Sequence, residues 1–217
     1  MSLSRDCRWS RTRAYCPAGA HICRCARVRE AAVVTHIELQ AAFGNDPIRT
    51  MPGRVAEQYV SRLHDRRILT EVGLPESLLE ILFFSDLGTG TPTTVGDLLH
   101  DPRLPGDIVI ANGLGGLACL SAQDGTVYWH RPGDERSLGL VNSSLDHFVA
   151  CLHRIWLHLR DLDLEYGEYD RESPAELGRE LRRIAADVHD VDPPSFDSPV
   201  RYRQTVVFHA LRYLVQE

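Results

Sequence analysis

The stretch 107–133, DIVIANGLGGLACLSAQDGTVYWHRPG, has the strongest β-strand character in the chain and decides its fold class. Apolar and β-branched runs bounded by turn residues are typical of strands. They predict strands at 107–111, 116–121, 126–130 and, just beyond, 137–142. Asp124-Gly125 stands between two of these runs, and this dipeptide favours a tight hairpin. Strands joined by such turns pair antiparallel, so the stretch predicts a mostly antiparallel sheet.

A helix is expected before this sheet, with one more strand between them. RVAEQYVSRLHDRRILTEVGLPE, residues 54–76, reads as a helix that stops at Gly73. Its approximate apolar stripe comprises Val55, Tyr59, Leu63 and Leu69. EILFFS, residues 80–85, is then expected as a buried strand, and the turn-rich segment 89–107 holds at most one short helical turn.

The helices after the sheet begin within LVNSSLDHFVACLHRI, residues 140–155. Ser143 is expected to cap the first of them, with Asp146 in the capping-box position that glutamate or glutamine usually takes. Its core-facing stripe comprises Leu145, Phe148, Val149, Leu152, Ile155, Trp156 and Leu159. Ser173-Pro174 and Ser198-Pro199 open two further helices. Central strands with helices before and after predict a single α+β domain, with a central, mostly antiparallel sheet flanked by helices.

The amino-acid composition excludes several classes of protein. The chain has 217 residues, 43% hydrophobic and 25% charged, which is ordinary for a globular domain. Its 24 basic residues are all arginine, a bias that indicates a GC-rich genome such as that of an actinobacterium. Without lysine the chain has neither a P-loop lysine nor a Schiff-base nucleophile. No apolar run reaches the roughly 18 residues that a membrane helix needs.

The charge is divided unevenly along the chain. Residues 1–33 hold seven arginines and two acids, a net charge of +5, whereas the rest holds 17 arginines and 28 acids, a net charge of −11. An acidic body disfavours nucleic acid as a direct ligand. It suits a protein partner with a basic surface.

The N-terminal 33 residues are interpreted as an extension that is disordered or not translated in the cell, which leaves a domain over 34–217. They hold Cys7, Cys16, Cys23 and Cys25, and a small zinc site is the alternative. The gaps between these cysteines differ from the C-x2-4-C spacing of structural zinc sites. The other two cysteines, Cys119 and Cys151, are too few for a disulfide framework and favour a reducing cytoplasm.

One stripe of the helix at 143–159 carries residues that could do chemistry: His147, Cys151, Arg154 and His158. Histidine and cysteine are metal ligands. However, the first and last of these residues lie about 16 Å apart along a helix axis, which is too far for one ion. A solvated polar face, opposite the apolar stripe, is therefore expected.

Two further motifs are weak. ANGLGG, residues 111–116, lacks the G-x-G-x-x-G pattern and precedes a predicted strand, so a tight turn or bulge is expected there; a ligand-binding loop over 112–116 is the alternative. His36-Ile37-Glu38 matches half of a zinc-deaminase signature, but no P-C-x-x-C follows it. The sequence thus names no nucleophile, general base, metal cage or cofactor site, and a protein that is not an enzyme is expected.

The most distinctive surface feature is RDLDLEYGEYDRE, residues 160–172. The candidate partner-binding residues in it are Asp161, Asp163, Glu165, Tyr166, Glu168, Tyr169 and Asp170. Acidic groups speed and steer encounter with a basic partner, and tyrosine supplies rigid contact area at low entropic cost. A solvated linker between two helices is the alternative.

The order of several motifs resembles a known family. The motifs are ILTEVGLPE at 68–76, IVIANGLGGLACLSAQDGTVYW at 108–129, LVNSSLDHFVACLHRI at 140–155, and a late Asp192-Pro193 before the closing helix. Together they resemble the SUKH superfamily, and within it the SUKH-4 group of bacterial immunity proteins. The resemblance covers 53–217, although no tryptophan follows the late Asp-Pro pair.

The resemblance implies a non-enzymatic α+β domain that binds and neutralises a cognate toxin in the cytoplasm. Such toxins are often nucleases or nucleic-acid deaminases with basic substrate clefts. The resemblance implies no cofactor, no metal and no membrane association. An intracellular adaptor or regulatory module with the same fold is the alternative function.

Overall fold

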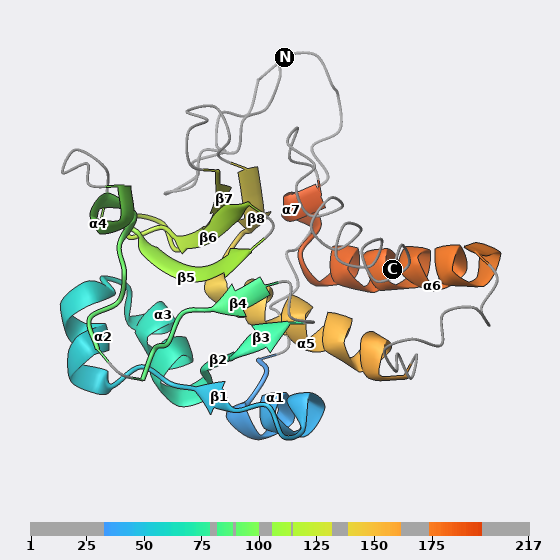
Figure 1. Cartoon of the computed structure of the whole chain (residues 1–217), viewed down its shortest axis with the longest axis horizontal. Coiled ribbons are helices and arrows are strands. Elements are labelled where there is room, and N and C mark those ends of the chain that lie inside the picture. Colours follow the sequence, from blue (N-terminus) through green and yellow to red (C-terminus); the bar gives the residue numbers. More distant parts are fainter. Residues whose placement is uncertain are drawn as a thin grey trace, which may run out of the picture.

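The computed structural model describes residues 33–78, 82–88, 90–99, 106–113, 115–131, 139–161 and 174–196 (Figure 1). Its main sheet has the strand order β3-β4-β5-β6-β7-β8, and every neighbouring pair is antiparallel. These strands are β3 (Ser77–Leu78), β4 (Leu82–Phe84), β5 (Ile108–Gly113), β6 (Gly116–Leu120), β7 (Val127–His130) and β8 (Gly139–Asn142). The spatial order follows the chain order, so the sheet is a meander of consecutive antiparallel pairs.

Helices surround this sheet, and a small second sheet pairs β1 (Ile48–Arg49) with β2 (Leu74–Pro75). The helical elements are α1 (His36–Phe43), α2 (Gly53–Tyr59), α3 (Leu63–Arg67), the π-helical turn η1 (Ile68–Val72), α4 (Val95–Leu99), α5 (Leu145–Asp161), α6 (Pro174–Val191) and α7 (Pro193–Phe196). In Figure 1, α1 lies below β3, α2 and α3 lie on the left below β5, and α6 lies beside α5 on the right. The predicted single α+β domain with a central antiparallel sheet is confirmed.

The strands predicted from 107–133 are confirmed, and glycines allow the tight turns that join them. Gly125 has a positive φ of 74° in the turn between β6 and β7, and its N–H donates to the Ser121 carbonyl at 3.1 Å. Gly113 pairs with Gly116 at the close of the β5–β6 hairpin, so the glycine-rich motif forms the tight turn that was expected. Glycine adopts such left-handed conformations without steric cost.

The main core lies between one face of the sheet and helices on that side. Alternate strand residues point into it, among them Ile108 and Ile110 of β5 and Val127 and Trp129 of β7. The α5 stripe contributes Leu145, Phe148, Val149 and Leu152 to this core, as its period predicts. Trp156 stacks on Phe43 of α1 with ring centroids 4.7 Å apart, and its Nε1 donates to the Ala42 carbonyl at 2.6 Å. Each fully buried large apolar side chain stabilises the fold by roughly 1.5–3 kcal/mol.

The prediction of one continuous helix over 54–76 is wrong, because this range forms α2, α3 and η1. The chain leaves helical geometry between α2 and α3, where Val60 has φ −109° and ψ 110°. Arg66 Nε donates to the Val60 carbonyl at 2.6 Å, and Ser61 Oγ donates to the Ala122 carbonyl in the β6–β7 turn at 2.5 Å. The bond from Ser61 holds the non-helical residues between α2 and α3 against the β6–β7 turn. Leu63, which was expected in the core, is 69% exposed. The predicted stop at Gly73 is confirmed.

Asp65 of α3 is buried beside this break, and its ionisation should cost stability. Burial raises its pKa above the usual value, and the charge of Arg62, whose guanidinium lies 3.6 Å from Oδ2, only partly offsets this. Its Oδ1 accepts no hydrogen bond from the described part of the chain. A carboxyl group whose pKa is raised on folding stabilises the protein below its unfolded pKa and loses that contribution as the pH rises through its folded pKa.

Asp65→Asn is therefore expected to raise the melting temperature at pH 7 relative to the wild type. The difference should shrink toward pH 3.5, because the wild-type carboxyl then becomes increasingly protonated in the folded and the unfolded state. Thermal unfolding by circular dichroism between pH 3.5 and 8 measures this. A constant difference across that range would show that ionisation of Asp65 is not the cause.

The strand predicted at 80–85 is present as β4 but is buried on one face only. Leu82 and Phe84 are buried, while Phe83 between them is 47% exposed. The short strands β1, β2 and β3 were not expected, because two residues are too few to show a period. The predicted helical turn in 89–107 is confirmed as α4. Among the described helices, none combines the length and the apolar character needed to cross a bilayer.

Candidate functional site

Helices α5 and α6 form an antiparallel hairpin with an apolar core of its own. This second cluster comprises Cys151, Ile155 and Leu159 from α5 and Ile184 and Val188 from α6, with Leu181, Val191 and Phe196 packed around it. The helix predicted to open at Pro174 is confirmed, and Leu181, Ile184 and Val188 lie on it at helical spacing. In Figure 1, the end of α5 and the start of α6 lie at the end of the hairpin away from the sheet.

A polar contact fastens the hairpin at its outer half. His158 of α5 is 13% exposed and lies between two acidic side chains of α6. Its Nδ1 is 3.2 Å from Glu180 Oε1, and its Nε2 is 2.9 Å from Asp187 Oδ2. Arg183 lies 3.8 Å from the other oxygen of Glu180. This histidine therefore links α5 to two successive parts of α6.

A buried polar cluster fastens the inner end of the hairpin to the sheet. Asp192, which follows α6, is fully buried and accepts three hydrogen bonds. The donors are Asn142 Nδ2 at 2.9 Å, the Ser143 backbone N–H at 2.9 Å and Ser143 Oγ at 2.7 Å. Through them the chain after α6 is tied to β8 and to the start of α5.

The solvated polar face expected for the His147 to His158 stripe is wrong. His147 and Cys151 are buried, at 8% and 3% exposure, and Cys151 packs with Ile184 and Val188 of α6. Asn142 Nδ2 lies 3.6 Å from the Cys151 sulfur. The residues described in the structure include no group of three or more His, Cys, Asp and Glu side chains placed to hold a metal ion. Cys151 and His158 of this stripe therefore face α6, whereas Arg154 is exposed as expected.

The expected capping residue of α5 is also corrected by one position. The helix starts at Leu145, and the hydroxyl of Ser144, not that of Ser143, lies 3.4 Å from the His147 backbone N–H. Ser143 instead donates its hydroxyl hydrogen to Asp192. Two adjacent serines are equivalent by local rules, and only the distant carboxylate distinguishes them.

The other sequence motifs have structural roles. Glu38 accepts a hydrogen bond from the Thr35 backbone N–H at 2.8 Å and forms a capping box, which lowers its pKa. Ile37 of the same motif is 78% exposed. In the ANGLGG motif, Asn112 pairs with Leu117 across the β5–β6 hairpin. Neither motif brings catalytic side chains together.

The sequence did not reveal a hydrogen bond between buried Asp107 and half-buried Tyr128 on the other face of the sheet. Tyr128 donates its hydroxyl hydrogen to Asp107 Oδ2 at 2.5 Å, and Asp107 Oδ1 accepts from the Ala122 N–H at 3.0 Å. Burial, and then the hydrogen bond to Asp107, raise the pKa of Tyr128. Burial raises the pKa of the adjacent Cys119 thiol to about 12, so this cysteine is no activated nucleophile. Residues 107 and 128 each read only as strand positions, which explains why sequence reasoning missed them.

The candidate partner-binding residues lie in the sequence between the end of α5 and the start of α6. Asp161 is the last residue of α5, and its side chain, together with Asp163, Glu165, Tyr166, Glu168, Tyr169 and Asp170, lies outside the described residues. The structure places the two flanking helix ends, at Asp161 and Pro174. The N-terminal extension and the helix predicted from Ser198 also lie outside the described residues.

Comparison with known proteins agrees with this arrangement. No curated protein and no solved structure matches the chain significantly. The model of the family described as SUKH-4 immunity protein matches residues 34–208, which is most of the chain. Its start coincides with the beginning of the described domain, after the basic N-terminal extension. The chain therefore belongs to the SUKH-4 immunity protein family.

Proposed function

We propose that this protein is a cytoplasmic immunity protein that neutralises a cognate toxin by stoichiometric binding. Family membership is the observation that carries the proposal. The architecture supports it, because His158 and Asp192 serve to join α5, α6 and β8 to one another. Cys119 and Cys151 are both buried and not joined in a disulfide, which suits a reducing compartment.

We further propose that the toxin presents a basic substrate cleft, as nucleases and nucleic-acid deaminases do. The net charge of −11 over residues 34–217 supports this, because opposite charge steers association. The acidic connection between α5 and α6 would enter the cleft. His158 in the outer half of the hairpin and Asp192 at its inner end hold the two helices that such a segment connects.

Co-expression with the toxin encoded beside the gene tests the proposal. Growth should be rescued by the intact protein, and the purified pair should form a 1:1 complex by light scattering after size exclusion. Recovery of growth without a complex would contradict stoichiometric neutralisation. Binding to a regulatory protein, and none to the toxin, would instead favour the adaptor function.

Neutralising acids in the connection is expected to slow association. The variant Asp163→Asn, Glu165→Gln, Glu168→Gln should lower the association rate constant about tenfold at low ionic strength and flatten its dependence on salt. Stopped-flow or surface-plasmon-resonance measurements of the association rate at about 20 to 300 mM salt record this, because the distance over which charges interact shortens over that range.

A matched control removes the same number of charges elsewhere. Glu57, Glu71 and Asp190 are exposed acids on α2, η1 and α6. Changing them to Gln, Gln and Asn should leave the association rate nearly unchanged. Equal slowing by both triple variants would mean that only net charge matters and that the connection is not the contact.

A further inference from the structure

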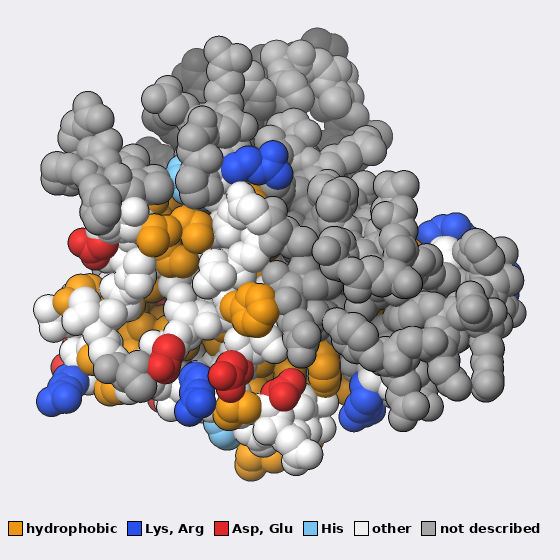
Figure 2. All heavy atoms as spheres, in the orientation of Figure 1, with side chains coloured by type: hydrophobic (Ala, Val, Ile, Leu, Met, Phe, Trp, Pro, Cys, Tyr) orange, Lys and Arg blue, Asp and Glu red, His pale blue; other side chains and the backbone are white. Residues whose placement is uncertain are grey.

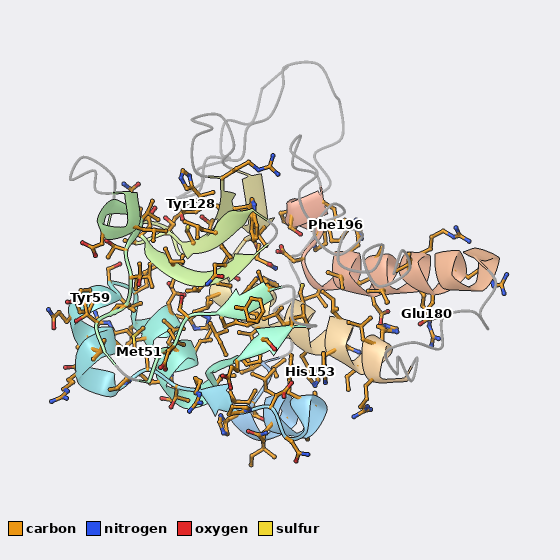
Figure 3. All side chains as sticks on the ribbon, viewed as in Figure 1. Met51, Tyr59, Tyr128, His153, Glu180 and Phe196 are labelled. Carbon is orange, nitrogen blue, oxygen red and sulfur yellow. The ribbon has the colours of Figure 1, made fainter. Side chains whose placement is uncertain are left out.

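The contact around His158 has a feature that its stabilising role alone does not explain: both ring nitrogens face carboxylate oxygens. The separations are 3.2 Å to Glu180 and 2.9 Å to Asp187. These acids are seven residues apart on α6, which is about two helical turns. They therefore lie on one side of α6 with the imidazole between them, where Figure 3 labels Glu180 at the junction with α5.

The number of protons on the ring decides how many of these contacts are favourable. A neutral imidazole has one N–H donor and one lone pair, so it can donate to only one of the two carboxylates. The other carboxylate would then face a lone pair. An imidazolium donates to both, and both bonds are charge-assisted.

We propose that His158 is a proton-controlled lock between α5 and α6. Protonated, it ties Glu180 and Asp187 to α5; deprotonated, it releases one of them and the outer half of α6 loosens. Because the imidazolium donates to both carboxylates and the neutral ring to only one, the outer half of α6 is held more firmly at low pH than at high pH. The lock would thus set how firmly the helix ends that flank 162–173 are held.

The other charged groups around the ring do not supply an alternative partner. On α6, Arg183 faces Glu180 from the far side at 3.8 Å. On α5, Arg154 is exposed one turn before His158. From α1, Glu38 interacts with His153, a different histidine more than one turn away. The two carboxylates of α6 are thus the acids in contact with His158 among the described residues.

Two measurements on the full chain test the lock at pH 5.5 and 8.5, on either side of the usual histidine range. Nitrogen-15 NMR of the imidazole should show two protonated ring nitrogens at pH 5.5 and one at pH 8.5. Hydrogen exchange, corrected for its intrinsic pH dependence, should show α6 amide protection about tenfold lower at the higher pH, the worth of one charge-assisted hydrogen bond.

Variants separate the lock from general acid effects. His158→Gln should remove the pH dependence of α6 protection, and Glu180→Gln or Asp187→Asn should reduce it. His189→Gln is the control, because His189 lies on the same helix but is half exposed and contacts Asp190 and Phe196 instead; it should keep the wild-type response. A neutral ring at pH 5.5, or the same pH dependence in the wild type and His158→Gln, would overturn the proposal.

Discussion

Gly73→Ala is expected to lower the free energy of unfolding by about 4 kcal/mol. Gly73 ends the π-helical turn with φ 84° and ψ −174°, a region that is almost confined to glycine and costs other residues about 1–3 kcal/mol. An added Cβ would also lie 2.5 Å from the Arg49 carbonyl oxygen and 2.9 Å from Ile48 Cγ2. Because the carbonyl belongs to β1, relief of the overlap would have to open the β1–β2 pair.

Urea unfolding followed by circular dichroism measures this loss, and Gly44 provides the control. Gly44 also has a positive φ, 63°, but nothing lies within 4 Å of its added Cβ. Gly44→Ala should therefore show only the backbone cost, about 1–2 kcal/mol. If the two variants lose equal stability, then contact with β1 contributes nothing.

Asp192→Ala is expected to cost about 3–4 kcal/mol. The carboxylate is fully buried, and its removal leaves three donors of Asn142 and Ser143 without their acceptor. Loss of a buried partner in a charged hydrogen-bond network has this magnitude. The chain after α6 should then separate from β8, so protection of α6 and α7 amides should fall before global unfolding.

Hydrogen exchange and urea unfolding together check this expectation. Asp190→Ala is the matched control, since the Asp190 side chain is 86% exposed and two residues away; its effect should stay within about 0.5 kcal/mol. An intermediate loss is expected for Asp192→Asn, which keeps an acceptor oxygen but not the charge. Wild-type stability of Asp192→Ala would show that the cluster does not hold the hairpin.

The exposed large apolar side chains of the described residues are scattered along the chain. Figure 2 shows isolated hydrophobic side chains over β4 and near α4, among mixed acidic and basic groups. Exposed Phe83 and Leu98, at 47% and 44%, are single apolar residues of the kind that most protein surfaces carry. Partner contact therefore rests, in our proposal, on the acidic connection.

The sequence by itself determined the elements whose rules are local. The strands of 107–130 follow from alternation and from Asp124-Gly125, whose glycine takes the positive φ that the turn requires. The apolar stripe of α5 and the opening of α6 at Pro174 follow from helical period and capping. The family resemblance, too, rested on the order of such local motifs.

Only the tertiary structure decided what the polar residues do. His147 and Cys151 look solvated on an isolated helix but are buried, and Cys151 packs against Ile184 of α6, 33 residues later. Ser143 forgoes the cap for Asp192, 49 residues away. The helix over 54–76 breaks where Ser61 and Arg66 bond carbonyls outside the helical pattern. Local patterns fix backbone conformation within a few residues, whereas burial and hydrogen-bond partners depend on which distant segments meet.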